Sequence, residues 1–146
     1  MKIKSSAFKN QKNIPTKFTC QGQDISPELS FENVPENTKY FALVVDDPDA
    51  PGQTFVHWLL WNIPANKKEL EQDFKPESAL QGKNDFGKLE YGGPCPPSGT
   101  HRYRFKLYAL DSKLDLDKGA SKIDLEKAMK GKVLKQAQLI GLYQKK

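Results

Sequence analysis

The chain has no long hydrophobic run, no repeat and no low-complexity stretch. None of its apolar segments approaches the roughly 20 residues that a membrane helix needs, so we predict no membrane span. Residues 1–13 carry charge but no apolar core like that of a secretory signal, which favours a cytoplasmic location. With 146 residues and no linker, the sequence predicts a single domain covering residues 1–146.

Cysteine is also scarce, because only Cys20 and Cys95 are present. Two cysteines so far apart exclude a zinc knuckle and a C-x-x-C redox motif. Their spacing does not reveal whether they meet in space. Since the predicted compartment is reducing, we expect two free thiols. A disulfide, if one formed, would brace the loop that contains Cys95.

The net positive charge of the chain comes entirely from its C-terminal quarter. Residues 1–111 hold 14 basic and 14 acidic residues, whereas residues 112–146 hold nine lysines and four acidic residues. Such a segment can attract nucleic acid or anionic lipid. Aromatic residues are not interleaved with these lysines, as nucleic-acid binding would require. We therefore predict a solvated helix face and no nucleic-acid partner.

Hydrophobic patterning predicts a mainly β protein. Residues 40–46 and 55–63 are apolar runs bounded by prolines, and residues 102–110 alternate between apolar and polar side chains, as in an antiparallel sheet. Residues 124–136 predict a helix with Asp124 as its N-cap, followed by a short strand over residues 137–143. The expected architecture is thus a set of strands with one helix near the C-terminus.

The first of three candidate site motifs is DPDAP, residues 47–51, directly after the first long strand. Pro48 and Pro51 fix the backbone and remove two donors, so the loop is stiff. The carboxylates of Asp47 and Asp49 are then held in set directions and can serve a binding site. The alternative is an Asx-type turn with solvated acids.

The second motif is His57 followed by Trp58, within the second strand. The period of two places His57 on the same face as Phe55, Leu59 and Trp61. A single histidine on such a face is either a ligand-binding group or a core residue whose ring nitrogens form hydrogen bonds within the protein.

The third motif covers residues 92–103, GGPCPPSGTHRY, at the end of a long aperiodic loop over residues 82–101. Its glycines and prolines predict a rigid wall with little side-chain bulk. His101 and Tyr103 share the inward face of the following strand. Rigidity just before an inward histidine favours a pocket, although a structural turn explains the composition as well. Long loops without periodicity in compact domains are usually functional.

Together the motifs supply two histidines and two aspartates. Protonated imidazoles oriented by carboxylates can bind an anion such as phosphate. The alternatives are a hydrolase or a metal-binding protein that uses the same four residues, Asp47, Asp49, His57 and His101. No G-x-S-x-G elbow provides a nucleophile, and the four residues form no compact metal motif. We therefore predict a binding protein that is not an enzyme and has no cofactor or metal.

The three motifs, in this order, resemble the phosphatidylethanolamine-binding protein family. Further similar segments are SPELSF at 26–31, NIPA at 62–65 and GPCPPSGTHRYRFKLYALD at 93–111. The resemblance spans roughly residues 15–143, nearly the whole chain, and is greatest to the short bacterial and archaeal branch, often called Raf-kinase-inhibitor-like.

The resemblance implies a large central antiparallel sheet packed on a smaller sheet, with a helix near the C-terminus. It implies a cavity for phosphate, phosphoethanolamine-like groups or small carboxylates, and a role in regulating a protein partner such as a kinase or protease. The aromatic residue that closes the pocket in longer members has no clear counterpart here, and Tyr143 is the nearest candidate. The implied ligand-binding residues are Asp47, Asp49, Ala50, Pro51, His57, Pro96, Pro97, Gly99, His101 and Tyr103.

Overall fold

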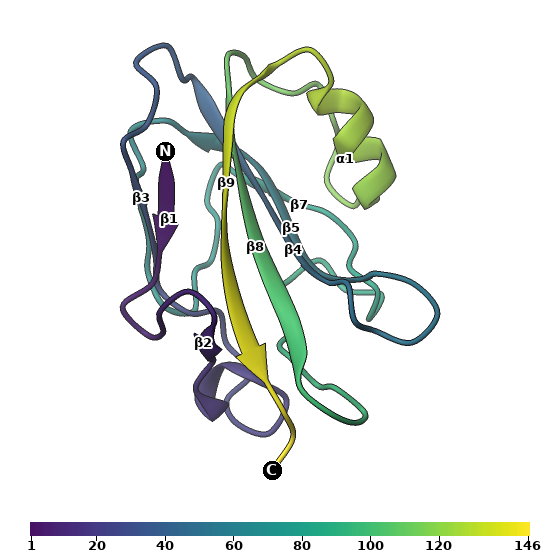
Figure 1. The fold of residues 1–146 in the computed structure, drawn as a ribbon. Helices are drawn as coiled ribbons and strands as arrows, with labels where there is room; N and C mark the ends of the chain where they lie inside the picture. The colour runs from purple at the N-terminus through teal and green to yellow at the C-terminus, as the bar shows by residue number, and fades with distance from the viewer.

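The computed structural model describes residues 1–146 and is built mostly from strands, as predicted (Figure 1). Its larger sheet has six strands, and all neighbouring pairs are antiparallel except β2 and β9. Their order across the sheet is β2 (Lys12–Asn13), β9 (Val133–Tyr143), β8 (His101–Leu110), β4 (Tyr40–Asp47), β5 (Phe55–Pro64) and β7 (Leu80–Gln81).

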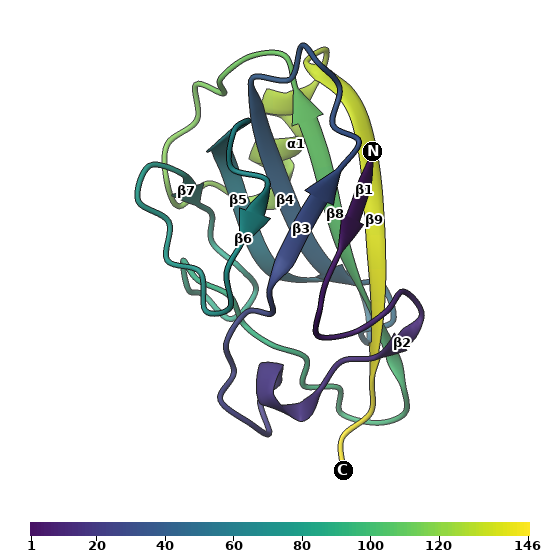
Figure 2. The ribbon, with the colours of Figure 1, turned by 90° about the vertical axis from the view of Figure 1, so that its left-hand side faces the viewer.

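The smaller sheet lies against one face of the larger one, while the single α-helix lies on the other face (Figures 1 and 2). It contains β1 (Lys2–Lys4), β3 (Leu29–Glu32) and β6 (Glu69–Leu70), with β3 in the centre. A 3-10 helix, η1 (Thr16–Phe18), follows β2. The predicted architecture of a large antiparallel sheet packed on a smaller sheet is therefore confirmed.

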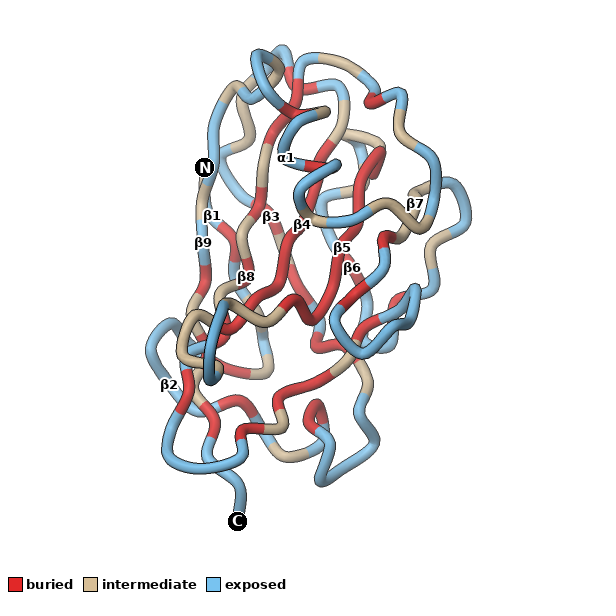
Figure 3. Tube along the Cα trace, turned by 90° about the vertical axis from the view of Figure 1, so that its right-hand side faces the viewer, coloured by how far each residue is buried: buried red, intermediate tan, exposed pale blue.

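The central strands β4, β5 and β8 are buried along most of their length (Figure 3). Their side chains form two separate cores. The first core fills the space between the sheets and contains 21 buried residues, among them Phe31, Leu43 and Phe105. The second lies on the opposite face, where Leu125 and Met129 of the helix pack on the sheet. Burying each such side chain contributes roughly 1.5–3 kcal/mol, so both faces of the sheet are fixed.

The helix α1 spans Lys122–Met129, which corrects the predicted range of 124–136. Ser121, not Asp124, is the N-cap: its hydroxyl accepts from the Asp124 backbone N–H at 3.1 Å, and the Asp124 carboxylate accepts from Ser121 in return. Gly131 has φ of +82° and therefore ends the helical path. Residues from Val133 onward belong to β9, which is longer than the predicted strand over 137–143.

A β-bulge in β5 decides where the His57 side chain points. Val45 of β4 pairs with Trp58, whereas the next residue, Asp46, pairs with Val56, so His57 is the additional residue of the bulge. The face of the strand therefore changes at His57. The expectation that His57 shares its face with Leu59 and Trp61 is wrong, because those two side chains belong to the core beneath α1.

Cys20 and Cys95 form a disulfide with a Cα–Cα distance of 5.5 Å, so the expectation of two free thiols is also wrong. The pairing depends on the approach of segments 75 residues apart in the chain, which their spacing does not reveal. No helix of the structure is long and apolar enough to cross a membrane.

Candidate functional site

The three motifs meet around one cavity of about 220 Å³ at the end of the central strands. Its polar groups come from β4, β5 and β8, and its remaining wall comes from two loops that supply prolines and an aromatic side chain. The lining residues are Asp47, Ala50, Pro51, Phe55, His57, Phe86, Cys95, Pro96, Pro97, His101 and Tyr103.

Asp47 and His101 form a buried pair at one side of this cavity. Asp47 Oδ2 lies 2.7 Å from His101 Nδ1, and both residues are less than 8% exposed. The other carboxylate oxygen of Asp47 accepts from the Asp49 backbone N–H at 2.8 Å. Asp47 therefore makes the Asx-type turn and also orients the imidazole. Because Nδ1 of His101 carries the proton toward Asp47, its Nε2 remains for a ligand.

Asp49 points away from the cavity and binds Arg102. The Arg102 guanidinium donates through Nε at 3.0 Å and Nη2 at 2.8 Å, and its backbone N–H donates at 2.9 Å. Hydrogen bonds from the Arg102 side chain lower the pKa of Asp49 to about 2. This clamp fastens the loop after β4 to the start of β8. It also neutralises the second carboxylate, which would otherwise repel an anion.

His57 also lines the cavity and is 4% exposed. Its Nδ1 lies 2.7 Å from the Gly92 carbonyl oxygen, so Nδ1 must carry the proton. Burial lowers the pKa of the His57 imidazole, although its bond to Gly92 and the charge of Asp47 act in the opposite direction. The neutral ring therefore presents the lone pair of Nε2.

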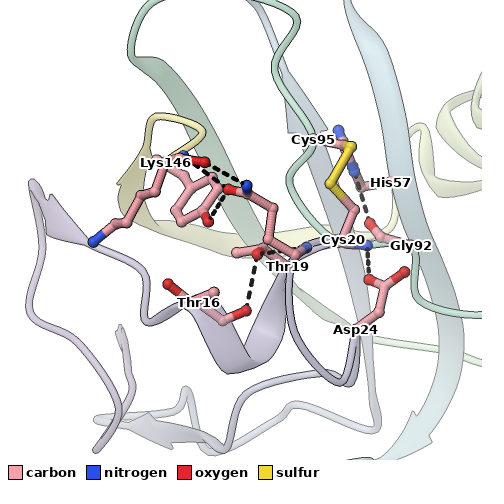
Figure 4. Close-up of a disulfide and its surroundings, with 11 residues drawn as sticks. Thr16, Thr19, Cys20, Asp24, His57, Gly92, Cys95 and Lys146 are labelled. Atoms are coloured by element: carbon pink, nitrogen blue, oxygen red, sulfur yellow. Dashed lines mark hydrogen bonds between the residues drawn. A yellow bond between two sulfur atoms is a disulfide. The ribbon is translucent and has the colours of Figure 1, made fainter.

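The loop that carries Gly92 is fastened to the N-terminal segment by several bonds (Figure 4). The Gly93 N–H donates to Asp24 Oδ1 at 2.7 Å, and the Cys20 N–H donates to the Pro94 carbonyl at 3.1 Å. The Cys20–Cys95 disulfide adds a covalent link beside His57. The wall of the cavity is therefore held from both sides, by the imidazole ring and by the N-terminal segment.

Tyr103 packs near both imidazoles. Its ring centroid is 5.2 Å from that of His57 and 6.4 Å from that of His101. The hydroxyl oxygen of Tyr103 is sealed from solvent and has no hydrogen-bond partner within the protein. Burial and the charge of Asp47 raise the pKa of Tyr103 above its ordinary value, so the hydroxyl keeps its proton. A buried donor without a partner costs free energy, and the polar groups that act on this hydroxyl are the Cys95 backbone and the Asp47 carboxylate.

A family model described as phosphatidylethanolamine-binding protein matches residues 4–144. This chain belongs to the phosphatidylethanolamine-binding protein family. The match covers all three motifs and every strand that contributes to the cavity. The predicted family membership is therefore confirmed.

Relatives of this member are found in archaea and bacteria. It is 50% identical to a UPF0098 protein of Methanothermobacter thermautotrophicus, with 99% of each chain covered. It is 51% identical to a UPF0098 protein of Aquifex aeolicus, covering 99% of this chain and 89% of the relative. A solved structure from Chlamydia trachomatis, a phosphatidylethanolamine-binding protein homolog named CT736, has a TM-score of 0.95 at 39% identity, with 99% and 97% of the chains covered.

A second solved structure is Escherichia coli YbcL, described as a member of the mammalian family, with a TM-score of 0.92 and 35% identity. The alignment covers 99% of this chain and 98% of YbcL. Both solved structures thus share the whole fold of this family member.

Of the ten residues expected in the site, eight line the cavity, while Asp49 and Gly99 do not. Gly99 is exposed at a turn with φ of +69° before β8. Sequence reasoning missed Phe55, Phe86 and Cys95. The signal that could have identified Phe55 is its position two residues before His57 in the same strand. The signal for Phe86 was only its position in the long aperiodic loop over residues 82–101.

Phe86 lies at the cavity mouth and is 45% exposed. Its ring packs edge-on against Phe55 and His57, with centroid distances of 4.8 and 5.5 Å. Tyr143, the aromatic considered from the sequence, is instead buried and donates to Gln21 Oε1 at 2.6 Å. The exposed aromatic beside the cavity therefore comes from the loop after β7 and not from the C-terminal segment.

The four residues of the hydrolase and metal alternatives do not converge as a set, because Asp49 is engaged by Arg102. No group of three or more His, Cys, Asp or Glu side chains has an arrangement that could hold a metal ion. The lining offers no serine, threonine or lysine, and Cys95 is bound in the disulfide. What the cavity presents is two imidazole Nε2 atoms among mostly apolar walls.

Proposed function

We propose that this protein is a non-catalytic binding protein whose cavity holds small anionic groups, above all phosphate-bearing groups such as phosphoethanolamine. The observation that carries the proposal is the buried Asp47–His101 pair in the wall of the cavity. Protonated His101 can donate through Nε2 to an anion while Asp47 stabilises its positive charge.

The electrostatic balance of the site supports an anionic ligand. Asp49 is neutralised by Arg102, and the charge of Asp47 is balanced by His101 when that ring is protonated. The apolar walls of Pro51, Pro96 and Phe55 exclude water and strengthen the remaining hydrogen bonds. Binding in such a site would allow the protein to regulate a partner, such as a kinase or a protease, in response to the ligand.

Titration calorimetry with phosphoethanolamine tests the proposal. We expect millimolar to micromolar affinity. His101→Ala should weaken binding at least about tenfold, because a hydrogen bond to a charged group contributes roughly 1.5–3 kcal/mol. Ser98→Ala, an exposed substitution in the same loop, is the matched control and should bind like the wild type.

Equal affinity in wild type and His101→Ala would remove this cavity from the proposal. Turnover assays with p-nitrophenyl phosphate and p-nitrophenyl acetate test the non-catalytic part. We expect no hydrolysis above background, since the lining supplies no free nucleophile. Hydrolysis that His101→Ala abolishes would show instead that the Asp47–His101 pair activates water.

A further inference from the structure

We propose that the cavity selects oxyanions that still carry an acidic proton, above all phosphate monoesters in their monoanionic form, over sulfate esters and phosphate diesters. The inference rests on the proposed function, because it concerns which anion that site accepts. It follows from the hydrogen-bonding roles that the fold imposes on the two imidazoles.

The proton on each ring is fixed at Nδ1. The Gly92 carbonyl can only accept, so Nδ1 of His57 must donate to it across 2.7 Å. Likewise, Asp47 Oδ2 requires a proton on Nδ1 of His101. The Nε2 atom of each ring has no partner within the protein, and neither atom is sealed from solvent. Both Nε2 atoms are therefore available to a molecule in the cavity.

The two rings differ in what they offer at Nε2. His101 contacts Asp47, and the Asp49–Arg102 pair lies next to it, so its positive charge has a direct carboxylate partner. His57 has no carboxylate in contact, and the charges that act on it from a distance are Asp47, Asp46 and Asp24. Burial among Phe55, Phe86 and Tyr103 outweighs those charges and favours the neutral ring. His101 thus donates when protonated, whereas His57 accepts.

A ligand that satisfies this site must accept from His101 and donate to His57. A monoanionic phosphate monoester does both, because it has unprotonated oxygens and one P–OH group. A sulfate ester has the same shape and a single negative charge but no proton to donate. A phosphate diester also lacks the proton. Either would place an oxygen lone pair against the lone pair of His57 Nε2, leaving a buried acceptor unsatisfied.

Methyl phosphate and methyl sulfate are the matched probes, and calorimetry measures the binding of both at about pH 5.5. Methyl phosphate is then largely monoanionic, since phosphate monoesters lose their second proton near about pH 6. We expect the dissociation constant of methyl sulfate to be about tenfold higher or more, the effect of an unsatisfied buried acceptor. Dimethyl phosphate should be disfavoured to a similar degree, and propyl phosphate, a larger monoester, controls for size.

Two variants distinguish the role of His57 from general weakening. His57→Gln, whose amide can present an N–H group to the ligand, should bring the ratio of the two dissociation constants close to one. His101→Ala removes a donor used by both esters and should weaken both while leaving their ratio unchanged. Thermal melts check folding, and if His57→Gln does not fold, the wild-type ratio decides alone.

The outcomes separate the two proposals. If the wild type binds methyl phosphate and methyl sulfate equally, the selectivity is refuted while anion binding stands. If neither binds and phosphoethanolamine does not bind, the proposed function itself fails. If propyl phosphate is rejected as strongly as dimethyl phosphate, size and not the proton excludes the diester, and the diester part of the inference is overturned.

Discussion

Removing the Cys20–Cys95 disulfide should destabilise the protein by about 4.5 kcal/mol, mostly through the unfolded chain. The bridge joins residues 75 positions apart. In the chain-entropy model, the loss of a cross-link of that span at 25 °C amounts to about 4.5 kcal/mol. The folded state itself should lose little, since Cys20 is exposed, Cys95 is half-buried, and serine is nearly the same size as cysteine.

Urea and thermal unfolding of wild type and the Cys20→Ser/Cys95→Ser double variant measure this difference. For a chain of this size, about 2–4 °C in Tm corresponds to 1 kcal/mol, so we expect a decrease of about 9–18 °C. Wild type treated with a dithiol reductant should match the double variant, and each single variant should match it as well, because breaking the bridge once removes it. A loss below about 1 kcal/mol would refute the reasoning, because it would leave the bridge without the constraint expected of its span.

Two further predictions concern the surroundings of the cavity. Asp46 is fully buried and accepts a hydrogen bond from Arg104 Nε at 2.7 Å, while Lys106 Nζ lies at 2.9 Å and Lys122 Nζ at 3.1 Å. Asp46→Asn should therefore lower the free energy of unfolding, measured in urea, by about 3–5 kcal/mol. Burial alone would raise the pKa of the Asp46 carboxyl, but these three cations lower it below its ordinary value of 3.8. The stabilisation that Asp46 gives the folded protein is therefore complete above pH 3.8 and is lost as pH falls through the lower pKa of the folded state. An Asp46→Asn variant whose acid unfolding matches that of the wild type would contradict this. Gly93→Ala should lower the free energy of unfolding by about 1–3 kcal/mol and weaken phosphoethanolamine binding, because the added Cβ would meet the Phe18 carbonyl and lie 2.5 Å from Asp24 Oδ1. Ser98→Ala serves as the neutral control. Unchanged stability and affinity would show that the cavity wall accommodates the added methyl group without cost.

The disulfide was the clearest feature that sequence reasoning got wrong. The expectation of free thiols followed from the predicted location, which itself stays a prediction. Pairing depends on the long-range contact between the segment after η1 and the loop before β8. No local pattern encodes that contact, since each cysteine lies in irregular backbone.

Local patterns did determine the strands β4, β5 and β8 and the inward direction of His101 and Tyr103. β8 alternates between apolar and polar residues, and its buried positions are those that the period of two predicts. Such patterns are readable because a strand turns its side chains to alternate faces whatever the rest of the chain does. The three motifs likewise identified eight of the residues that line the cavity, and they also identified the family.

What the tertiary structure decided is how those residues are oriented. The bulge at His57 exists because β4 and β5 pair with a shift in register, and this shift turns the ring toward the cavity. Asp47 and Asp49, two residues apart and of the same type, have different partners because His101 and Arg102 lie on opposite faces of β8. The sequence by itself supplied the residue types and their alternation, which are local properties. Register, long-range pairing and the position of each proton depend on neighbours that only the folded chain brings together.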